Sequence, residues 1–212
     1  LLFIYLVILV DTLEGFMIEL RNVVVAYESR VILDSINLTI DDGETLVILG
    51  GSGSGKSTLL RLLIGLQRPT SGQIIVDGTD ITTLSEDEFN TVRRKMGMVF
   101  QYSALFDSMS VGENVAFGLR QHTDLGDDEI RRIVAERLDW VGLKGYESYM
   151  PNELSGGMKK RVSLARAIAL DPSLILYDEP SSGLDPITSG TISMLIKGMQ
   201  QRLGCTSIVV TH

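Results

Sequence analysis

The sequence predicts an α/β fold built on a mostly parallel sheet, with an antiparallel β flank and a helical subdomain. Short, wholly apolar runs bounded by turn residues, such as 45–49 and 174–177, are typical of buried parallel strands. Segments with apolar residues at helical spacing alternate with these runs, and this alternation favours a parallel sheet. A chain of 212 residues is long enough to bury a substantial core.

The sequence of residues 18–78 predicts the antiparallel flank and the start of the parallel sheet. Residues 18–40 contain several short strands separated by turn residues, which we expect to pair antiparallel. The run at 45–49 predicts a buried strand, and a glycine loop joins it to a helix from Lys56. The segment SGQIIVDG at 71–78 predicts another antiparallel strand that ends in a turn.

Most of the elements predicted after residue 84 are helices. A capping box of Ser85 and Glu88 predicts a helix that runs towards Lys95, and a strand at 97–100 follows. We expect the helical subdomain at about 102–170, where apolar residues recur at helical spacing. The remaining elements are a strand at 174–177, a helix around 192–203 and a strand at 207–210.

The beginning of the chain does not fit this pattern. Leu1 to Val10 are all apolar, yet a membrane-spanning helix needs roughly 20 such residues, and a signal peptide would carry a basic region first. Strand-like alternation begins only at Met17. We therefore expect 1–16 to be a leader and 17–212 to be the domain, truncated at its C-terminal end. The alternative is an extra edge strand or a membrane-surface anchor.

Composition narrows the function classes. The net charge of −8 argues against a general nucleic-acid surface, which would carry a basic patch. The single cysteine, Cys205, cannot form an intramolecular disulfide, so we expect a reducing compartment. We expect Cys205 to act as a small apolar residue beside a strand.

A glycine-rich loop lies between the predicted strand at 45–49 and the predicted helix. Its sequence, GGSGSGKS, has the spacing G-x-x-x-x-G-K-S that binds nucleotide phosphates in this setting. Backbone N–H groups would surround the β-phosphate, Lys56 would meet the β- and γ-phosphates, and Ser57 would offer its hydroxyl to Mg²⁺. The residues expected to hold the nucleotide are Gly50, Gly51, Ser52, Gly53, Ser54, Gly55, Lys56, Ser57 and Thr58.

Polar residues stand at the ends of other predicted strands, where the ligands of open α/β sheets gather. Asp178 and Glu179 follow one apolar run; Asp178 is expected to anchor Mg²⁺ and Glu179 to polarise the attacking water. Gln101 is expected to reach Mg²⁺ or that water, and His212 the γ-phosphate. These residues predict a hydrolytic site at one edge of the sheet.

Two other side chains have less diagnostic positions. Tyr27 either stacks on an adenine ring or packs in the core as a strand aromatic, and both alternatives stay open. His122, in the polar stretch RQHTD, is expected to be a surface histidine.

A second stretch, PNELSGGMKKR at 151–161, predicts a helix start with Ser155 as its cap. Lys159, Lys160 and Arg161 fall in its first two turns, where the helix dipole favours acids. A flexible, positively charged helix N-terminus suits an anion. The chain therefore carries two predicted anion sites.

From Met17 onward the chain resembles the ATPase subunits of ABC transporters. The resemblance rests on the order of Tyr27, GGSGSGKST, Gln101, LSGGM, LILYDE, SGLD and His212. In that family these are the adenine-stacking aromatic, Walker A, Q-loop, signature, Walker B, D-loop and switch histidine. The resemblance implies the ABC-ATPase form of the P-loop NTPase fold, ATP and Mg²⁺ as cofactors, and ATP hydrolysis coupled to transport.

The resemblance also accounts for the second anion site. Subunits of this family pair head to tail, so that each ATP lies between the P-loop of one subunit and the signature of the other. This implies a homodimer in which Ser155, Gly156, Gly157 and Asp185 serve the partner's ATP, whose charge offsets the nearby cations. A solvated helix face stays the alternative for at least one of those cations.

Three segments resemble the Mla/Mkl subfamily, the ATPases of MCE-associated lipid transporters. They lie at 99–119, 153–172 and 181–190, and Met158 stands where the family signature usually has Gln. The resemblance implies a membrane permease docked beside Gln101, an MCE-type lipid-binding partner, phospholipid cargo and a place at the cytoplasmic face of the inner membrane.

Two other functions stay open. The ATPase of another ABC importer, for example one for amino acids, has the same catalytic residues, because other subunits choose the cargo. A DNA-repair or chromosome-structure ABC ATPase would carry long coiled-coil or zinc-binding insertions. The interval 101–154 is short, lacks heptads and contains no cysteine, which disfavours that class.

Overall fold

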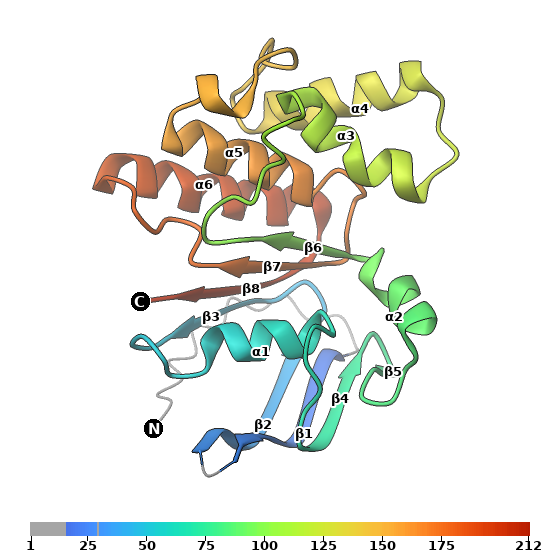
Figure 1. Cartoon of the computed structure of the whole chain (residues 1–212), viewed down its shortest axis with the longest axis vertical. Coiled ribbons are helices and arrows are strands. Elements are labelled where there is room, and N and C mark those ends of the chain that lie inside the picture. The colour runs from blue at the N-terminus through green and yellow to red at the C-terminus, as the bar shows by residue number, and fades with distance from the viewer. Residues whose placement is uncertain (1–15, 29) are drawn as a thin grey trace.

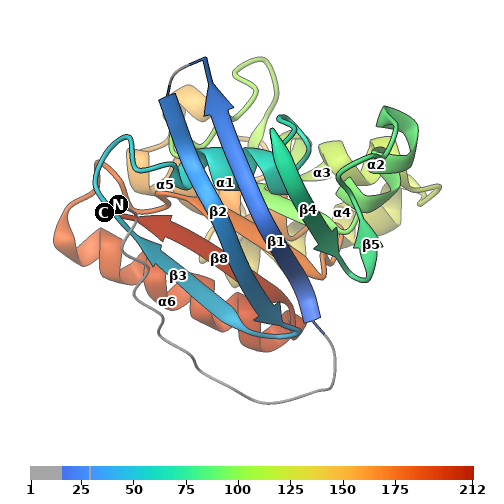
Figure 2. The same cartoon turned by 90° about the horizontal axis from the view of Figure 1, so that it is seen from below.

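The computed structural model describes residues 16–28 and 30–212, and the leader expected at 1–16 lies outside this part except for its last residue. Within the described residues, the strands form two four-stranded sheets, one antiparallel and one parallel. Figures 1 and 2 show the parallel sheet between the antiparallel sheet and most of the helices. The predicted α/β fold with an antiparallel flank is confirmed. No helix in the described ranges is long and apolar enough to cross a membrane.

The antiparallel sheet has the strand order β2-β1-β4-β5. Its strands are β1 (Phe16–Tyr27), β2 (Arg30–Asp41), β4 (Ser71–Val76) and β5 (Thr79–Asp80). The expectation of several short strands at 18–40 was wrong, because β1 and β2 are long and continuous. Asn22 and Ser35, which resemble turn residues, instead adopt left-handed backbone conformations at shifts in the register of the pair. Such bulges let a strand absorb a residue without ending.

Asn22 and Asn37 join the two strands beside these bulges. The Asn22 backbone N–H donates to Asn37 Oδ1 at 2.9 Å, and Asn37 Nδ2 donates to Asn22 Oδ1 at 3.1 Å. Asn37 Nδ2 also donates to the Ser35 carbonyl at 3.0 Å. Side-chain amides therefore replace part of the backbone ladder that the bulges interrupt.

The parallel sheet has the strand order β3-β8-β7-β6, and each neighbouring pair is parallel. Its strands are β3 (Thr45–Leu49), β6 (Met96–Val99), β7 (Leu174–Asp178) and β8 (Thr206–Thr211). The four predicted runs match these strands to within one residue at each end. Because the strands are parallel, their carboxyl ends share one edge, on the left in Figure 1.

The two faces of the parallel sheet pack against different elements. Leu176 and Val210 face the antiparallel sheet and the helix between the sheets, whereas Ile175 and Tyr177 face the opposite helices. This alternation follows from the period of two in a strand and explains why β7 is apolar throughout. The helices are α1 (Lys56–Leu63), α2 (Glu86–Arg93), α3 (Val111–His122), α4 (Asp127–Trp140), α5 (Gly156–Ala167) and α6 (Pro186–Leu203), with a 3₁₀ turn, η1 (Pro151–Glu153).

The start of α2 confirms the predicted capping box. Ser85 Oγ accepts the Glu88 backbone N–H at 3.4 Å, and Glu88 Oε2 accepts the Ser85 N–H at 2.8 Å. These bonds satisfy two donors that a helix start leaves without partners.

Trp140, the only tryptophan of the chain, lies where α4 meets α6. The guanidinium carbons of Arg137 and Arg202 lie 4.2 and 5.1 Å from the centroid of its ring. Arg137 is buried, and its Nη2 donates to Asp171 Oδ1 at 2.6 Å. Cation–π and ionic contacts therefore connect α4 to α6 and to the segment after α5.

A substitution at Gly97 can test how closely β6 packs against α5. A methyl group at Gly97 would lie 2.4 Å from the Ala167 carbonyl oxygen, which belongs to the backbone and has little room to move. We expect Gly97→Ala to lower the free energy of unfolding by about 1–3 kcal/mol through overpacking. Gly198→Ala, in α6, is the control: nothing lies within 4 Å of the added carbon, and better helix propensity should raise stability by up to about 1 kcal/mol. Urea unfolding compares the two, and equal stabilities would contradict the packing argument.

Candidate active site

The predicted phosphate loop connects the carboxyl end of β3 to α1. Lys56 Nζ donates to the carbonyls of Gly50 and Gly51, the latter at 3.1 Å, and the side chain is only 5% exposed. Gly55 has a φ of 95°, and a methyl group there would lie 2.8 Å from Leu33 Cδ2, so the turn into α1 requires glycine. The ammonium group is thus held inside the turn of the loop.

The outer part of the loop is open. Methyl groups at Gly51 or Gly53 would meet nothing within 4 Å, and both residues are exposed together with Ser52. Ser54 Oγ is buried without a hydrogen-bond partner among the described residues. An open backbone loop with an unpartnered hydroxyl and a lysine fits the oxygen-rich phosphates of ATP. Thr58, also predicted to bind, lies half-buried in the first turn of α1.

The carboxylate of Glu179 is the meeting point of the predicted catalytic residues. His212 Nε2 lies 2.7 Å from Glu179 Oε1, Gln101 Nε2 donates to Oε2 at 3.2 Å, and Lys56 Nζ lies 3.9 Å from Oε1. Glu179 is 9% exposed. Four residues that follow four different strands are therefore brought together at one edge of the sheet, as the sequence predicts.

The backbone of Glu179 is held in an uncommon conformation. Its φ is 45°, and its N–H donates to the Val210 carbonyl of β8 at 2.9 Å. A left-handed conformation costs a residue other than glycine about 1–3 kcal/mol and persists where the surroundings enforce it. The conformation turns the chain directly after β7 at the position of the carboxylate.

Ser57 and Asp178 form the predicted metal-binding pair. Ser57 Oγ donates to Asp178 Oδ1 at 3.1 Å. Hydroxyl, carboxylate and amide oxygens, the last from Gln101, are the ligands that Mg²⁺ prefers, and Mg²⁺ often takes only one or two carboxylates and adds substrate phosphates. Within the described ranges no group of three or more His, Cys, Asp or Glu is placed to hold a metal. The donor set therefore fits a phosphate-bound Mg²⁺.

Ser182 is a contact that the sequence analysis missed. Gln101 Nε2 donates to its hydroxyl at 3.3 Å as well as to Glu179. The signal lay in the sequence, because Ser182 precedes Gly183 in the same loop as the predicted Asp185.

Tyr27 is exposed to 54%, so the alternative of a core aromatic is wrong. It ends β1 at the hairpin with β2, and the neighbouring β2 residues Ile32 and Leu33 lie against Gly55. Stacking of Tyr27 on adenine stays a prediction. His122 is exposed, as expected.

The second predicted anion site begins α5. Ser155 Oγ accepts the Met158 backbone N–H at 3.3 Å, which makes Ser155 the cap of the helix. Figure 1 shows α5 and α1 on opposite faces of the parallel sheet. Ser155 and the phosphate loop therefore do not form one site within this chain.

Ser155, Gly156 and Gly157 instead line a hollow of about 530 Å³ together with the start of α6. Asp185 lines the same hollow and caps α6: its Oδ1 accepts the Ile187 and Thr188 N–H groups at 3.0 Å. The Thr188 hydroxyl donates to Asp185 Oδ2 at 2.6 Å, and this bond is the largest cause of the lowered pKa of Asp185. The predicted signature and D-loop residues thus share one open hollow.

The two glycines in this hollow have different surroundings. A methyl group at Gly157 would lie 2.8 Å from Thr188 Cγ2, whereas one at Gly156 would have its nearest neighbour, Leu184 Cδ2, at 4.0 Å. Gly157 therefore permits the close approach of α5 to α6, and Gly156 leaves space in the hollow.

Two of the three cations in α5 donate hydrogen bonds to backbone carbonyls of the same chain. Lys160 is 5% exposed and donates to the carbonyls of Gln101 and Glu179, the latter at 3.5 Å. Arg161 Nη1 donates to the Val141 and Gly142 carbonyls at 3.2 Å. Lys160 is therefore held by carbonyls inside the chain, whereas Arg161 also lines the hollow, so its pairing with a bound anion stays a prediction.

Lys160 was missed as a residue of the site. Burial lowers its pKa, and the nearby carboxylates of Glu179 and Asp178 act in the opposite direction. Its spacing gave a signal, because Lys160 and the buried Leu164 are four residues apart and share a helix face.

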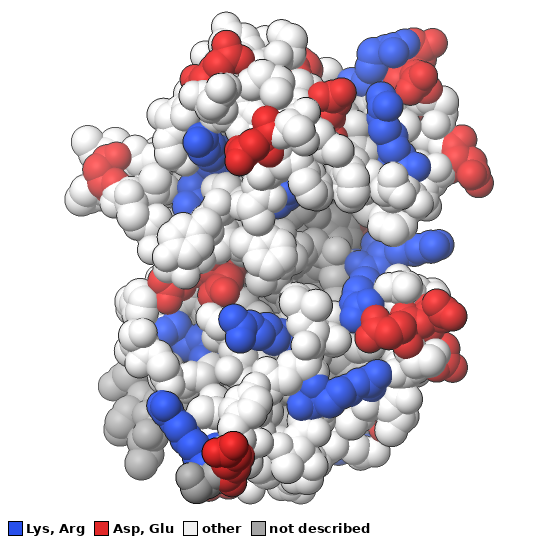
Figure 3. Space-filling view, in the orientation of Figure 1, with Lys and Arg blue, Asp and Glu red and all other residues white. Residues whose placement is uncertain are grey.

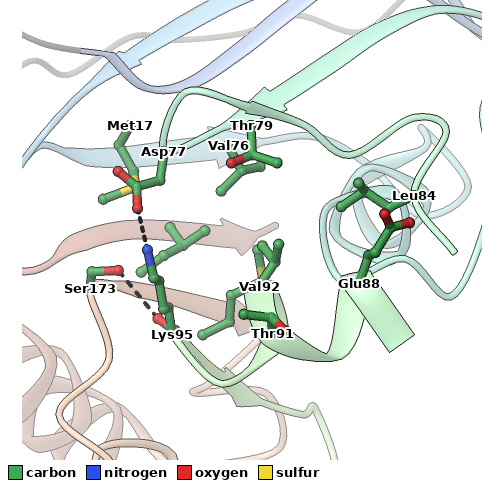
Figure 4. Close-up of a pocket in the computed structure, with 12 residues that line it drawn as sticks. Met17, Val76, Asp77, Thr79, Leu84, Glu88, Thr91, Val92, Lys95 and Ser173 are labelled. Atoms are coloured by element: carbon green, nitrogen blue, oxygen red, sulfur yellow. Dashed lines mark hydrogen bonds and ion pairs between the residues drawn. The ribbon is translucent and has the colours of Figure 1, made fainter. Parts of the chain in front are cut away.

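A different pocket, of about 320 Å³, lies away from these residues (Figure 4). Met96 and Leu174, the first residues of β6 and β7, help to line it, so it lies at the amino ends of these strands. Its rim includes an ion pair of 2.7 Å between Lys95 Nζ and Asp77 Oδ2. None of the predicted site residues lines this pocket.

The sequence matches the family described as ABC transporter over residues 33–182. It is 50% identical over 196 residues to the Haemophilus influenzae intermembrane phospholipid transport system ATP-binding protein MlaF. The aligned region covers 92% of this chain and 74% of the relative. MlaF of Escherichia coli is 46% identical, with 92% and 73% covered. The probable ribonucleotide transport ATP-binding protein mkl of Mycobacterium bovis is 48% identical, but the chain spans only 55% of its length.

Two solved structures have the same fold. The ATP-binding cassette MJ0796, in a dimeric post-hydrolysis state bound to ADP and Pi, aligns with a TM-score of 0.85 and 37% identity over 92% of this chain and 88% of that chain. The protein cbiO1 from Clostridium perfringens, part of the ABC transporter complex cbiONQ, gives a TM-score of 0.86 and 36% identity, with 94% and 79% covered.

The contact of Gly157 with Thr188 can be tested by a double-mutant cycle. Gly157→Ala should lower the free energy of unfolding by about 1 kcal/mol, because Thr188 is held by Asp185 and cannot turn its methyl group away. In a Thr188→Ser background, which removes that methyl group, the same change should be neutral or stabilising by up to about 1 kcal/mol. Gly156→Ala is the matched control and should not destabilise. Additive effects of the two substitutions in urea unfolding would contradict the contact.

Proposed function

The chain belongs to the ABC transporter family, and from this premise we propose that it is the subunit whose ATP hydrolysis drives a phospholipid transporter. The chain is an ATPase. The observation that carries the proposed mechanism is the meeting of Lys56, Gln101 and His212 at the Glu179 carboxylate, beside the Ser57–Asp178 pair.

Each of these residues has a proposed role in hydrolysis. The loop at 50–58 binds the phosphates through its N–H groups and Lys56. Ser57 and Asp178, with the amide oxygen of Gln101, would hold Mg²⁺, which would neutralise charge at the phosphates. Glu179 accepts a proton from the attacking water. His212, which lies 2.7 Å from the same carboxylate, is proposed to reach the γ-phosphate from there.

We further propose a homodimer in which each ATP lies between two subunits. Support comes from α1 and α5, which follow the phosphate loop and Ser155 and lie on opposite faces of the parallel sheet. The open hollow at Gly156, Gly157 and Asp185 is then the half of the site that meets the partner's ATP. The solved relative MJ0796 is dimeric with ADP and Pi bound.

Phospholipid is the cargo that the relatives favour. The two MlaF relatives, 50 and 46% identical to this chain, are named for phospholipid transport, and mkl, 48% identical, is named for ribonucleotides. The relative with the highest of these three identities is an MlaF protein, so we propose phospholipid as the cargo in preference to an amino acid. An MCE-type lipid-binding protein is a proposed further partner.

The permease is proposed to dock at the face shown in Figure 3. That face is hollowed between the part formed by the helices and the part around α1 and α2, and Lys and Arg side chains lie beside the hollow. Phe100, Tyr102 and Phe106, which follow β6, remain exposed to 38, 87 and 41%. Exposed aromatic side chains are typical anchors of protein interfaces. Docking there would hold the subunit at the cytoplasmic face of the inner membrane.

The composite site can be tested with two substitutions in the full-length protein. Glu179→Gln keeps the shape of the side chain and should retain ATP binding, while hydrolysis falls by about 10²–10⁴-fold through loss of the general base. A dimer should then accumulate on a sizing column with Mg-ATP. Adding Ser155→Arg should prevent that dimer but leave ATP binding to the monomer's own phosphate loop intact. Lys56→Ala, which removes the phosphate contact, is the control that should lose hydrolysis.

Two outcomes would count against this arrangement. Undiminished hydrolysis by Lys56→Ala would refute the phosphate loop, and a dimer that persists in the Glu179→Gln, Ser155→Arg double variant would refute the role of Ser155.

The cargo requires a separate experiment. The full-length protein should be purified from its native membranes with its permease, and the bound molecules extracted and identified by mass spectrometry. Enrichment of phospholipid over a mock purification, together with stimulation of hydrolysis by vesicles of that lipid, is expected. Enrichment of an amino acid or a ribonucleotide instead would overturn the lipid assignment without affecting the ATPase.

A further inference from the structure

We propose that Lys160 is a positioning residue that connects the signature helix to the hydrolytic residues Gln101 and Glu179 of the same subunit. The inference rests on the proposed dimer, in which α5 meets the partner's ATP. It adds a physical connection between the half-site that serves the partner and the half-site that performs hydrolysis.

The contacts of Lys160 are made to the backbone of both residues. Its Nζ donates to the Gln101 carbonyl and lies 3.5 Å from the Glu179 carbonyl. The side chains of these two residues bond each other through Gln101 Nε2 and Glu179 Oε2 at 3.2 Å. One ammonium group therefore fixes the backbones of the two residues whose side chains form the centre of the site.

Burial makes this connection stiff. Lys160 is 5% exposed, and a buried ammonium is stable only while its donors are satisfied. If α5 moves, water has little access to replace the carbonyls, so the carbonyls must move with the helix or the contacts must break. The lowered pKa of Lys160 is consistent with this burial.

A second cation of α5 holds the same segment further on. Arg166 donates through Nη2 to the Ser103 carbonyl at 2.8 Å and through Nη1 to the Ala104 carbonyl at 2.6 Å. Both acceptor residues have left-handed backbone conformations, with φ of 64° and 47°. The segment after β6 is therefore attached to α5 at two points, and Lys160 is the one that also reaches Glu179.

Ser155, at the start of α5, and Lys160 are close enough along the helix to move together. Ser155, the helix cap, precedes Lys160 by five residues, which corresponds to about 7.5 Å of helix rise. When the partner's ATP draws the start of α5 towards it, Lys160 transmits the displacement to Gln101 and Glu179. Movement of α5 onto the partner's nucleotide thereby changes the positions of Gln101 and Glu179 in the subunit's own hydrolytic site.

The test compares three substitutions in the full-length protein. Lys160→Met keeps the aliphatic stem and removes the ammonium; we expect kcat to fall about 10–100-fold, the scale of a small misplacement of reacting groups, with nucleotide affinity unchanged. Lys197→Met is the control, since Lys197 is exposed on α6 and its side chain has no hydrogen bond or ion pair to the described residues; it should behave as wild type. Lys160→Arg restores donors with a different shape and should recover part of kcat.

The outcomes separate this inference from the proposed function. If wild type shows no ATP hydrolysis, the proposed function fails; if wild type hydrolyses ATP and Lys160→Met has the same kcat, only this inference fails. A fall in affinity equal to the fall in kcat would indicate general damage and overturn it too. Should Lys160→Met not fold, Lys160→Gln decides, because its shorter side chain cannot reach both carbonyls: reduced kcat at unchanged affinity supports positioning, and full kcat contradicts it.

Discussion

A buried carboxylate, that of Glu179, sets the requirement that the rest of the site has to meet. At 9% exposure its charge needs partners, and it finds them in Lys56, Gln101 and His212. These residues follow different strands, so their meeting depends on the parallel register of β3, β8, β7 and β6. A shift of one strand by a single residue would turn its side chains to the other face and remove one partner from the carboxylate.

The same parallel sheet separates the two predicted anion sites of the chain. The phosphate loop opens beside α1 on one face, and Ser155 opens beside α6 on the other. Lys160 passes between these regions, because it starts on α5 and ends at the backbone of Gln101 and Glu179. The predicted hydrolytic residues therefore lie together, whereas the two predicted nucleotide surfaces lie apart, which is consistent with the proposed homodimer.

The parts of the fold that one physical rule dominates could be predicted from the sequence. The strands of the parallel sheet are buried on both faces, so their sequences are apolar throughout and easy to recognise. The phosphate loop has a fixed spacing, and strand ends that share an edge brought Asp178, Gln101 and His212 to it. The subfamily resemblance also agreed with the MlaF relatives.

The errors arose where long-range contacts outweighed local preference. Asn22 and Ser35 favour turns locally, but pairing along β1 and β2 absorbs them as bulges. Lys160 was placed at an anion site because of its position in the helix, whereas its partners are carbonyls 59 and 19 residues away in the sequence. The exposure of Tyr27 depends on how the β1–β2 hairpin projects, which no local pattern encodes.

The position of Trp140 gives the molecule an internal optical probe. It is the only tryptophan, and the charged groups of Arg137 and Arg202 lie over its ring from α4 and α6. Charges at such distances shift the energy of the indole excited state, so the emission maximum depends on how closely the two helices approach. Stopped-flow fluorescence of the unlabelled protein would therefore follow movement between the helical part and α6 in real time, without a reporter dye and without any substitution.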